Sequence, residues 1–319
     1  MFGRNKQKDQ QIKMNYQRDY FIDAIYEAAK KDNDIFILSA DFGAPALDKF
    51  RVNLKKQFIH MGISEQNMIN VAAGLAMEGK KVFVYAMAPF VTLRCLEQHK
   101  CCSSLMNLPI NTIVAGIGLG YADAGPTHYC MEDQASLRSL IGSHVYTVSD
   151  AISAKILAQY LLKNKKFSFS RLERLPVKDI YQNKKIDFKS FDNGFNYLVK
   201  SKKNNFKNLI IAQGYQTNRV YQQLIDKDLK DKFDLIDMYR SKPFPKNLLN
   251  IISKYKKVKI VDEQILSSSL ASIVAENLLI NSKNVNVESF NLKENHVFQN
   301  GGREKLLNEN GLSIKKILQ

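Results

Sequence analysis

Apolar residues in the first half of the chain alternate between short uninterrupted runs and longer stretches with helical spacing. Uninterrupted apolar runs are typical of strands buried on both faces, whereas a helical period indicates an amphipathic helix. The pattern predicts strands at residues 35–40, 81–88, 111–116, 144–149 and 167–171. It predicts helices from Tyr16 and at residues 65–77, 91–106, 131–141 and 151–162. Such alternation favours a parallel sheet covered by helices on both faces.

A polar stretch, residues 177–207, interrupts this rhythm, and the alternation resumes after it. The second half predicts strands at residues 208–212, 233–238, 258–262 and 285–290, helices from Gln216, Lys246 and Ser267, and a helical segment at 303–318. We therefore expect an α/β protein of two domains, each a mostly parallel sheet covered by helices. The expected boundaries are a flexible tail at 1–13, a first domain at 14–185 and a second at 186–319.

Composition narrows the class of protein. Hydrophobic residues make up 45% and charged residues 24% of the 319 residues, which is typical of globular domains and excludes a disordered or collagen-like chain. The longest apolar run, residues 82–91, is half of the ~20 residues that a membrane-spanning helix needs, so we expect no membrane partner. Four cysteines without a CxxC pair, and no apolar leader-like segment near Met1, favour a cytoplasmic location and no metal site in this chain.

The formal net charge of +16 raises the question of nucleic-acid binding. Residues 163–207 hold 13 Lys and Arg against 4 Asp and Glu, a net charge of +9 and over half of the excess. This stretch has neither the interleaved aromatic residues of a single-strand groove nor the spacing of a helix-turn-helix or zinc finger. We expect a solvated basic surface and no nucleic-acid partner.

One segment, Gly62-Ile-Ser-Glu-Gln-Asn-Met68, carries the strongest local signal. Ser64 is a favourable N-cap residue, and Glu65 at the start of the following helix suits the positive end of the helix dipole. The small residues that follow allow another backbone to approach closely: Ala72, Ala73, Gly74 and Ala76. Taken alone, this segment is a capped helix with a small-residue packing face.

The neighbouring segments give Glu65 a second interpretation. In order along the chain they are Ser39-Ala-Asp41, Gly62-Ile-Ser-Glu-Gln66, Pro89-Phe-Val-Thr-Leu-Arg94, Gly125-Pro-Thr-His128, Arg171 and Val261-Asp-Glu-Gln264. This series resembles the pyrimidine-binding and C-terminal domains of transketolase-type thiamine diphosphate enzymes. The resemblance covers about residues 15–319.

The resemblance implies roles for individual residues. Glu65 would be catalytic and hydrogen-bond N1′ of the cofactor's aminopyrimidine, Phe90 would stack on that ring, and Arg94 and Asp41 would also bind the cofactor. His128 would be catalytic and contact substrate hydroxyls, and the Arg171 guanidinium would bind a sugar phosphate. Two purely structural alternatives stay open: a surface salt bridge for Arg94 and a capping role for Asp41.

A complete transketolase also carries a diphosphate-binding domain with a Gly-Asp-Gly motif, which does not occur here. The resemblance therefore implies the C-terminal, β-type half of a split enzyme that transfers a two-carbon ketol unit between sugar phosphates. A partner subunit with the diphosphate-binding domain would anchor thiamine diphosphate and Mg²⁺. This chain would form a homodimer within an α2β2 heterotetramer.

Two departures put pentose-phosphate substrates in doubt. Sugar-phosphate transketolases have an aspartate directly before the Gly-Pro-Thr-His turn, where this chain has Ala124, with Asp123 one residue earlier. The family's upstream histidine is also absent, with Ala115 and Gly116 in its place. Open alternatives are an acyl-transferring subunit, similar to deoxyxylulose-phosphate synthase or a 2-oxoacid dehydrogenase β subunit, and a non-catalytic scaffold subunit.

Overall fold

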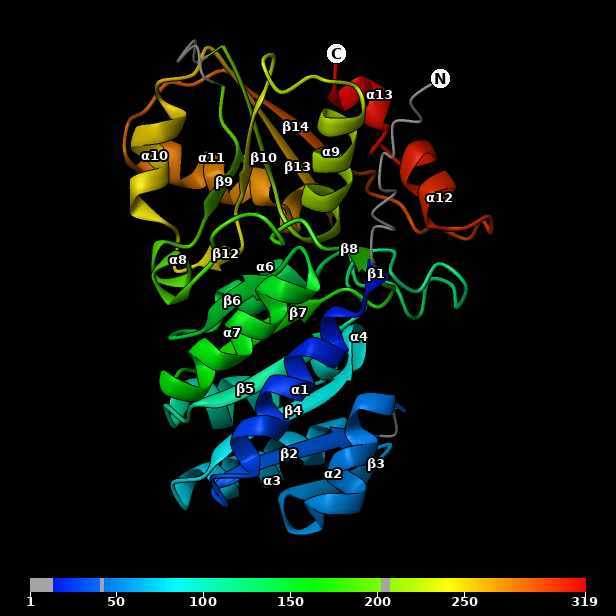
Figure 1. Cartoon of the computed structure of the whole chain (residues 1–319), viewed down its shortest axis with the longest axis vertical. Coiled ribbons are helices and arrows are strands. Elements are labelled where there is room, and N and C mark those ends of the chain that lie inside the picture. Colours follow the sequence, from blue (N-terminus) through cyan, green and yellow to red (C-terminus); the bar gives the residue numbers. More distant parts are fainter. Residues whose placement is uncertain (1–13, 41–42, 202–206) are drawn as a thin grey trace, which may run out of the picture.

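The computed structural model describes residues 14–40, 43–201 and 207–319, which form two α/β units stacked end to end (Figure 1). The predicted tail at 1–13 and Asp41 lie outside the described residues. The fold class predicted from the sequence, mostly parallel sheets covered by helices, is confirmed. The domain boundary near residue 185 stays a prediction.

The first unit is built on a seven-stranded sheet with the order β12-β6-β7-β5-β4-β2-β3. All neighbours are parallel except β12, which runs antiparallel to β6. The strands are β2 (Ile35–Ala40), β3 (Phe58–Gly62), β4 (Lys81–Met87), β5 (Ile110–Ala115), β6 (His144–Thr147), β7 (Ser168–Leu172) and β12 (Arg240–Lys242). β12 comes from the second half of the chain, so a segment beyond residue 185 joins the sheet of the first unit.

Helices cover both faces of this sheet, as the alternation predicted. Along β4, Phe83 and Tyr85 pack with helix α1 and helix α7, whereas Val82 and Val84 pack with helix α3 on the other face. The helices are α1 (Gln17–Ala29), α2 (Asp48–Asn53), α3 (Glu65–Met77), α4 (Ala88–Val91), α5 (Leu96–Gln98), α6 (Asp133–Ser139), α7 (Ala151–Lys163) and α8 (Phe188–Asn193). Short 3-10 turns lie at Pro45–Leu47 and Lys55–Gln57.

One predicted helix is wrong in extent. The stretch 91–106 is not continuous but consists of α4, α5 and a π-helical segment, His99–Leu105. The Thr92 hydroxyl donates to the carbonyl of Ala88 at 2.6 Å, a side-chain bond that competes with regular helix geometry. The break turns Arg94 back toward α3, which is how it reaches the site described below.

The second unit has a five-stranded sheet with the order β14-β13-β10-β11-β9, parallel except for β9. Its strands are β9 (Asn196–Val199), β10 (Asn208–Ala212), β11 (Asp234–Asp237), β13 (Lys257–Ile265) and β14 (Val287–Leu292). Helices α9 (Gly214–Asp226), α12 (Arg303–Glu309) and α13 (Ile314–Ile317) pack on one face, and α10 (Lys246–Ile252) and α11 (Leu270–Ile280) on the other. A 3-10 turn at Leu266–Ser268 precedes α11.

The predicted helical segment at 303–318 is interrupted. Gly311 has φ +104°, and a side chain there would meet the carbonyl oxygen of Asn291, so the chain turns between α12 and α13. A two-stranded antiparallel ribbon, β1 (Met14–Asn15) with β8 (Val177–Lys178), lies where the two units meet (Figure 1).

Candidate active site

Glu65 opens helix α3 directly after the edge strand β3. Gly62 adopts φ +68°, a conformation that favours glycine, and turns the chain from the strand into the helix. Ser64 occupies the predicted N-cap position, but its hydroxyl donates to the carbonyl of Met61 at 2.6 Å and does not cap the helix. The Glu65 side chain is 7% exposed, so a carboxylate is held close to the surface in a largely desolvated position.

The guanidinium of Arg94 contacts Glu65 and Phe90 together. Nη1 of Arg94 donates to Oε2 of Glu65 at 2.8 Å, and its Cζ lies 4.3 Å from the centroid of the Phe90 ring. The Phe90 ring in turn meets the His128 imidazole edge to face at 5.4 Å. Four residues predicted from three motifs are therefore in contact. Arg94 forms the salt bridge that was the alternative interpretation, and its partner is the candidate site residue Glu65.

A depression of about 510 Å³ opens beside this cluster. Its lining comes from the start of α3 and from the broken helix: Ile63, Ser64, Glu65, Gln66, Asn67, Asn70, Arg94 and Gln98. Oε1 of Glu65 has no hydrogen-bond partner among the described residues. The depression thus offers a free carboxylate oxygen and an arginine to a polar ligand, and the Phe90 ring, which is not part of its lining, lies against that arginine.

His128 lies on a loop whose two ends are joined by a β-bridge. Gly118 and Cys130 form an antiparallel bridge, with N–H to carbonyl distances of 2.9 and 3.0 Å. Within the loop, the His128 amide donates to the carbonyl of Gly125 at 3.0 Å, and Gly125 has φ +83°. His128 is half-buried, and its ring centroid is 5.9 Å from that of Tyr121.

Asp123, the carboxylate nearest to the missing family aspartate, already has a partner. It is exposed and forms an ion pair with Arg174, whose guanidinium lies 4.4 Å from the Tyr121 ring centroid. The Arg174 hydrogen bond lowers the pKa of Asp123 below its usual range. Sequence reasoning missed Arg174 and Tyr121 as neighbours of His128, and the only signal was the second arginine three positions after Arg171.

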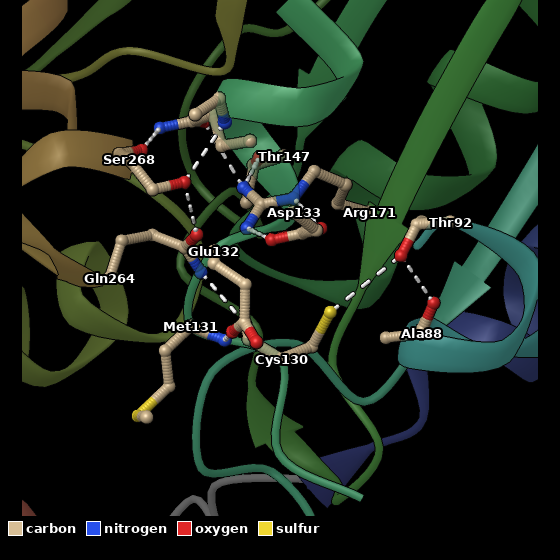
Figure 2. Close-up of polar contacts among 12 residues, drawn as sticks. Ala88, Thr92, Cys130, Met131, Glu132, Asp133, Thr147, Arg171, Gln264 and Ser268 are labelled. Carbon is tan, nitrogen blue, oxygen red and sulfur yellow. Dashed lines mark hydrogen bonds and ion pairs between the residues drawn. The ribbon is translucent and has the colours of Figure 1, made fainter. Parts of the chain in front are cut away.

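Arg171 does not face this depression. It is 1% exposed, and its Nε and Nη2 donate to the two carboxylate oxygens of Asp133, both at 2.8 Å, while Nη1 donates to Thr147 at 2.7 Å (Figure 2). This fork–fork pairing uses the same donors that would bind a phosphate. The placement therefore argues against the predicted substrate-binding role of Arg171 and indicates a structural one.

Metal ligands do not gather anywhere in the part of the chain that the structure describes. Within residues 14–40, 43–201 and 207–319, no group of three or more His, Cys, Asp and Glu side chains could hold a metal ion. The same described residues contain no helix that is both long and apolar enough to cross a membrane. Asp41, the remaining predicted cofactor contact, lies outside the described residues.

Comparison with known proteins connects this geometry to a family. Residues 14–177 match the family described as "Transketolase, pyrimidine binding domain". One subunit of the apulose-4-phosphate transketolase of Phocaeicola vulgatus is 29% identical over 82% of this chain and 83% of its own length. The 1-deoxy-D-xylulose-5-phosphate synthase of Fusobacterium nucleatum is 27% identical over 94% of this chain but only 49% of its own length.

A solved structure shares the fold along almost the whole chain. It is described as a split gene transketolase, inactive beta4 tetramer, and superposes with a TM-score of 0.81 at 24% identity. The match covers 95% of this chain and 96% of that chain. The likeness therefore extends through both units and not only through the part that carries Glu65 and His128.

Proposed function

The chain belongs to the family of proteins with a transketolase pyrimidine-binding domain, and from this premise we propose that it is the C-terminal, β-type subunit of a split thiamine diphosphate-dependent transketolase. It would transfer a two-carbon ketol unit between sugar or sugar-phosphate substrates. The observation that carries the proposal is the contact among Glu65, Arg94, Phe90 and His128, which come from three segments of the first unit.

The residues at the depression fit the aminopyrimidine end of thiamine diphosphate. Glu65 offers the free oxygen Oε1 at the depression, and the Phe90 ring lies against the Arg94 guanidinium that Glu65 binds. We propose that a partner subunit contacts the same ligand. When bound, the cofactor supplies the carbon nucleophile that carries the two-carbon unit. We assign the diphosphate and Mg²⁺ mainly to the partner, because the 319 residues contain no Gly-Asp-Gly motif.

Each side chain of the cluster has a task in this proposal. Glu65 holds a proton at N1′ of the pyrimidine, and Arg94 fixes its carboxylate by holding Oε2. Phe90 stacks on the pyrimidine and excludes water from one side of the site. His128 hydrogen-bonds the hydroxyl groups of the substrate and exchanges protons with them.

The remodelled loop bears on the substrate. Ala124 supplies no carboxylate and Asp123 is paired with Arg174, so the hydroxyl-binding aspartate of pentose-phosphate transketolases has no counterpart in the described loop. We propose a dedicated ketol donor or acceptor other than the common pentose phosphates. Acyl transfer from a 2-oxoacid is the second candidate, favoured by the match to a deoxyxylulose-phosphate synthase over 94% of the chain.

We propose that the chain assembles as a homodimer within an α2β2 heterotetramer in the cytoplasm, where thiols such as its four free cysteines stay reduced. The structural neighbour described as an inactive beta4 tetramer supports self-association of such a β chain without its partner. Light scattering of the purified chain, alone and with the N-terminal subunit, tests this. A monomer in both samples would contradict it.

Calorimetric titration with thiamine diphosphate and Mg²⁺ tests the split-subunit assignment. The chain alone should show no micromolar binding, and the reconstituted complex should bind the cofactor. Tight binding by the chain alone would refute the need for a partner. Hydroxypyruvate and pyruvate then distinguish the reaction classes, because only hydroxypyruvate delivers a ketol unit. Transfer to an aldose acceptor from hydroxypyruvate but not pyruvate supports the transketolase, and the reverse supports the acyl-transferring alternative.

A further inference from the structure

The end of strand β13 in the second unit reaches the loop of the first unit that carries His128. We define the His128 loop as residues 118–131, whose stem is the bridge between Gly118 and Cys130. Both sides of this stem form hydrogen bonds with the segment 263–265. The position of His128 therefore depends on contacts from a different folding unit.

Gln264 holds the returning side of the stem. Its Nε2 donates to the carbonyl of Cys130 at 3.0 Å, and the backbone amide of Ile265 donates to the carbonyl of Met131 at 3.1 Å. Its Oε1 accepts from the Ser268 hydroxyl at 3.1 Å, which fixes the orientation of the amide (Figure 2). Gln264 is 1% exposed, so no water competes for these bonds.

Glu263 holds the outgoing side. Its Oε1 accepts from the backbone amide of Leu119 at 2.8 Å, and Arg303 donates to both carboxylate oxygens at 2.9 and 3.0 Å. Gly118 has φ +58°, and a Cβ built there would lie 2.7 Å from Cγ of Glu263. The stem thus needs glycine at this position, both for its backbone conformation and for the close approach of Glu263.

The contact continues from the stem to the other side of the site. Cys130 Sγ lies 3.7 Å from the hydroxyl of Thr92, the residue that ends helix α4, and α4 carries Phe90 (Figure 2). Leu119, Tyr129 and Met131 of the loop also belong to the apolar core of the second unit. The second unit therefore fixes the loop from which His128 meets Phe90.

We propose that Glu263 and Gln264 are positioning residues, which act on the reaction by holding the His128 loop from the second unit. The catalytic part of this inference rests on the proposed function, whereas the loop contact can be measured without cofactor or partner. In the sequence, Val261-Asp-Glu-Gln264 stands out only as part of the family resemblance, which implies no role for it.

Backbone amide exchange in the purified chain tests the contact. Gln264→Leu keeps the side-chain volume and removes all three hydrogen bonds of the amide, which join it to Cys130, Glu263 and Ser268. Glu263→Gln removes the charge that pairs with Arg303. We expect exchange in residues 118–131 to rise on the order of tenfold, the equivalent of about one buried hydrogen bond, with no change in β4 or β5. Glu276→Gln is the matched control, because Glu276 pairs with Arg138 across the same two units away from the loop.

The NMR resonance of the His128 imidazole reports directly on the surroundings of the ring. The chain has five histidines, so the His128 Cε1–H resonance can be assigned by its loss in His128→Ala. In Gln264→Leu it should move toward the position of a solvated histidine, because the ring leaves Phe90 and Tyr121. If Gln264→Leu unfolds the chain, Ser268→Ala is measured instead, which releases the Gln264 amide and also removes the hydroxyl that accepts from the Ala135 amide. Unchanged exchange and an unchanged resonance in folded variants would overturn the proposal.

The effect on catalysis is measured in the complex reconstituted with the N-terminal subunit. Glu263→Gln and Gln264→Leu should lower kcat for ketol transfer about tenfold, while hydrogen–deuterium exchange at the thiazolium carbon stays near normal. In a His128→Ala background the same changes should have no further effect, since they act through that residue. Additive losses would overturn the positioning role. If no variant and no wild-type complex transfers ketol units, the proposed function fails, but the amide exchange still decides the loop contact.

Discussion

Arg94 Nη1 lies 2.8 Å from Glu65 Oε2, and this pair connects the broken helix after β4 to the first residue of α3. Because only one carboxylate oxygen is engaged, the pair orients Glu65 and leaves Oε1 for a ligand. Arg94 is 42% exposed and Glu65 7%, so the arginine end of the pair is accessible to solvent while the carboxylate is not. A half-exposed pair of this kind contributes little to folding stability.

Arg94→Ala should therefore disturb the orientation of the Glu65 carboxylate while leaving the folded state almost as stable. We expect the free energy of unfolding to fall by no more than about 1 kcal/mol and turnover of the reconstituted complex to fall about tenfold, less than on loss of Glu65. Arg51→Ala is a close control, because Arg51 also pairs with a carboxylate, Asp48, and lies over a phenylalanine ring, Phe58, but away from the depression. Equal turnover losses in the two variants would contradict a specific role for Arg94.

Glu65→Gln tests the proton-holding role. Glutamine keeps the shape of the side chain but cannot carry the acidic proton, so turnover should fall by about 10²–10⁴-fold, as for the loss of general acid–base help. Folding should survive, because the loss at the start of α3 is limited to a dipole contribution of about 0.3–1 kcal/mol and the half-exposed pair with Arg94. The measurement is hydrogen–deuterium exchange at the thiazolium carbon in the reconstituted complex.

His128→Ala provides the contrast for that measurement. We assign His128 to binding the substrate and not the cofactor. Exchange at the thiazolium carbon should therefore stay near normal while sugar turnover falls. Normal exchange in Glu65→Gln, with cofactor bound and the complex intact, would remove the catalytic assignment of Glu65. The two variants together distinguish a cofactor role from a substrate role.

The family resemblance, not the apolar pattern, assigned Glu65, Phe90 and His128 to one site, and in the structure Arg94 joins Glu65 to the Phe90 ring, which contacts His128. The path of Arg94 was less predictable, since it lies between α4 and α5, where the helix predicted at 91–106 is interrupted. Strand β3 was missed because its residues are half-buried at an edge and show no clear alternation. Neither the interruption of a helix nor a half-buried edge strand is recorded in the apolar spacing.

Long-range pairings explain the remaining gaps. The sequence shows Arg171 near the end of a strand, but not that helix α6 brings Asp133 to its guanidinium. Nor does it show that β12, a strand of the second half, joins the sheet of the first. Val261-Asp-Glu-Gln264 was visible as a motif, but its contact with the His128 loop depends on how the two units pack.

Arg171→Ala should be a stability variant. Removing the guanidinium leaves the Asp133 carboxylate, which is 0% exposed, without its partner, and breaking a buried pair in this way typically costs about 3–5 kcal/mol. Chemical denaturation of the purified chain measures the loss. Arg174→Ala is the control, because its pair with Asp123 is exposed and should change stability by about 1 kcal/mol or less.

The double variant Arg171→Met with Asp133→Leu sharpens this test. It removes both charges at once, so it should recover part of the stability that Arg171→Ala loses. A stable Arg171→Ala chain that has lost only the recognition of phosphorylated substrates would instead restore the substrate-binding role predicted from the sequence.

Asp237 at the end of β11 should make stability depend on pH. Its carboxyl group is fully buried and accepts from Ser149, Thr217 and Tyr181 at 2.7 to 3.0 Å. Burial raises the pKa of Asp237 from 3.8 to about 7, although the hydrogen bonds from these hydroxyls oppose the shift. The folded state therefore keeps a proton at this residue over a pH range in which the unfolded chain has released it.

The sign of the effect follows from proton binding. Between pH 4 and pH 7 the folded state binds more protons than the unfolded state at Asp237, so its contribution to stability is complete below about pH 4 and is lost as the pH rises to about 7. Relative to Asp237→Asn, which cannot titrate, the wild-type chain should lose about 4 kcal/mol over this range, at 1.36 kcal/mol per pH unit. Urea denaturation of both proteins at intervals from pH 4 to pH 8 measures the difference. A difference that stays constant with pH, or that favours the wild type more as pH rises, would show that Asp237 is ionised in the folded protein.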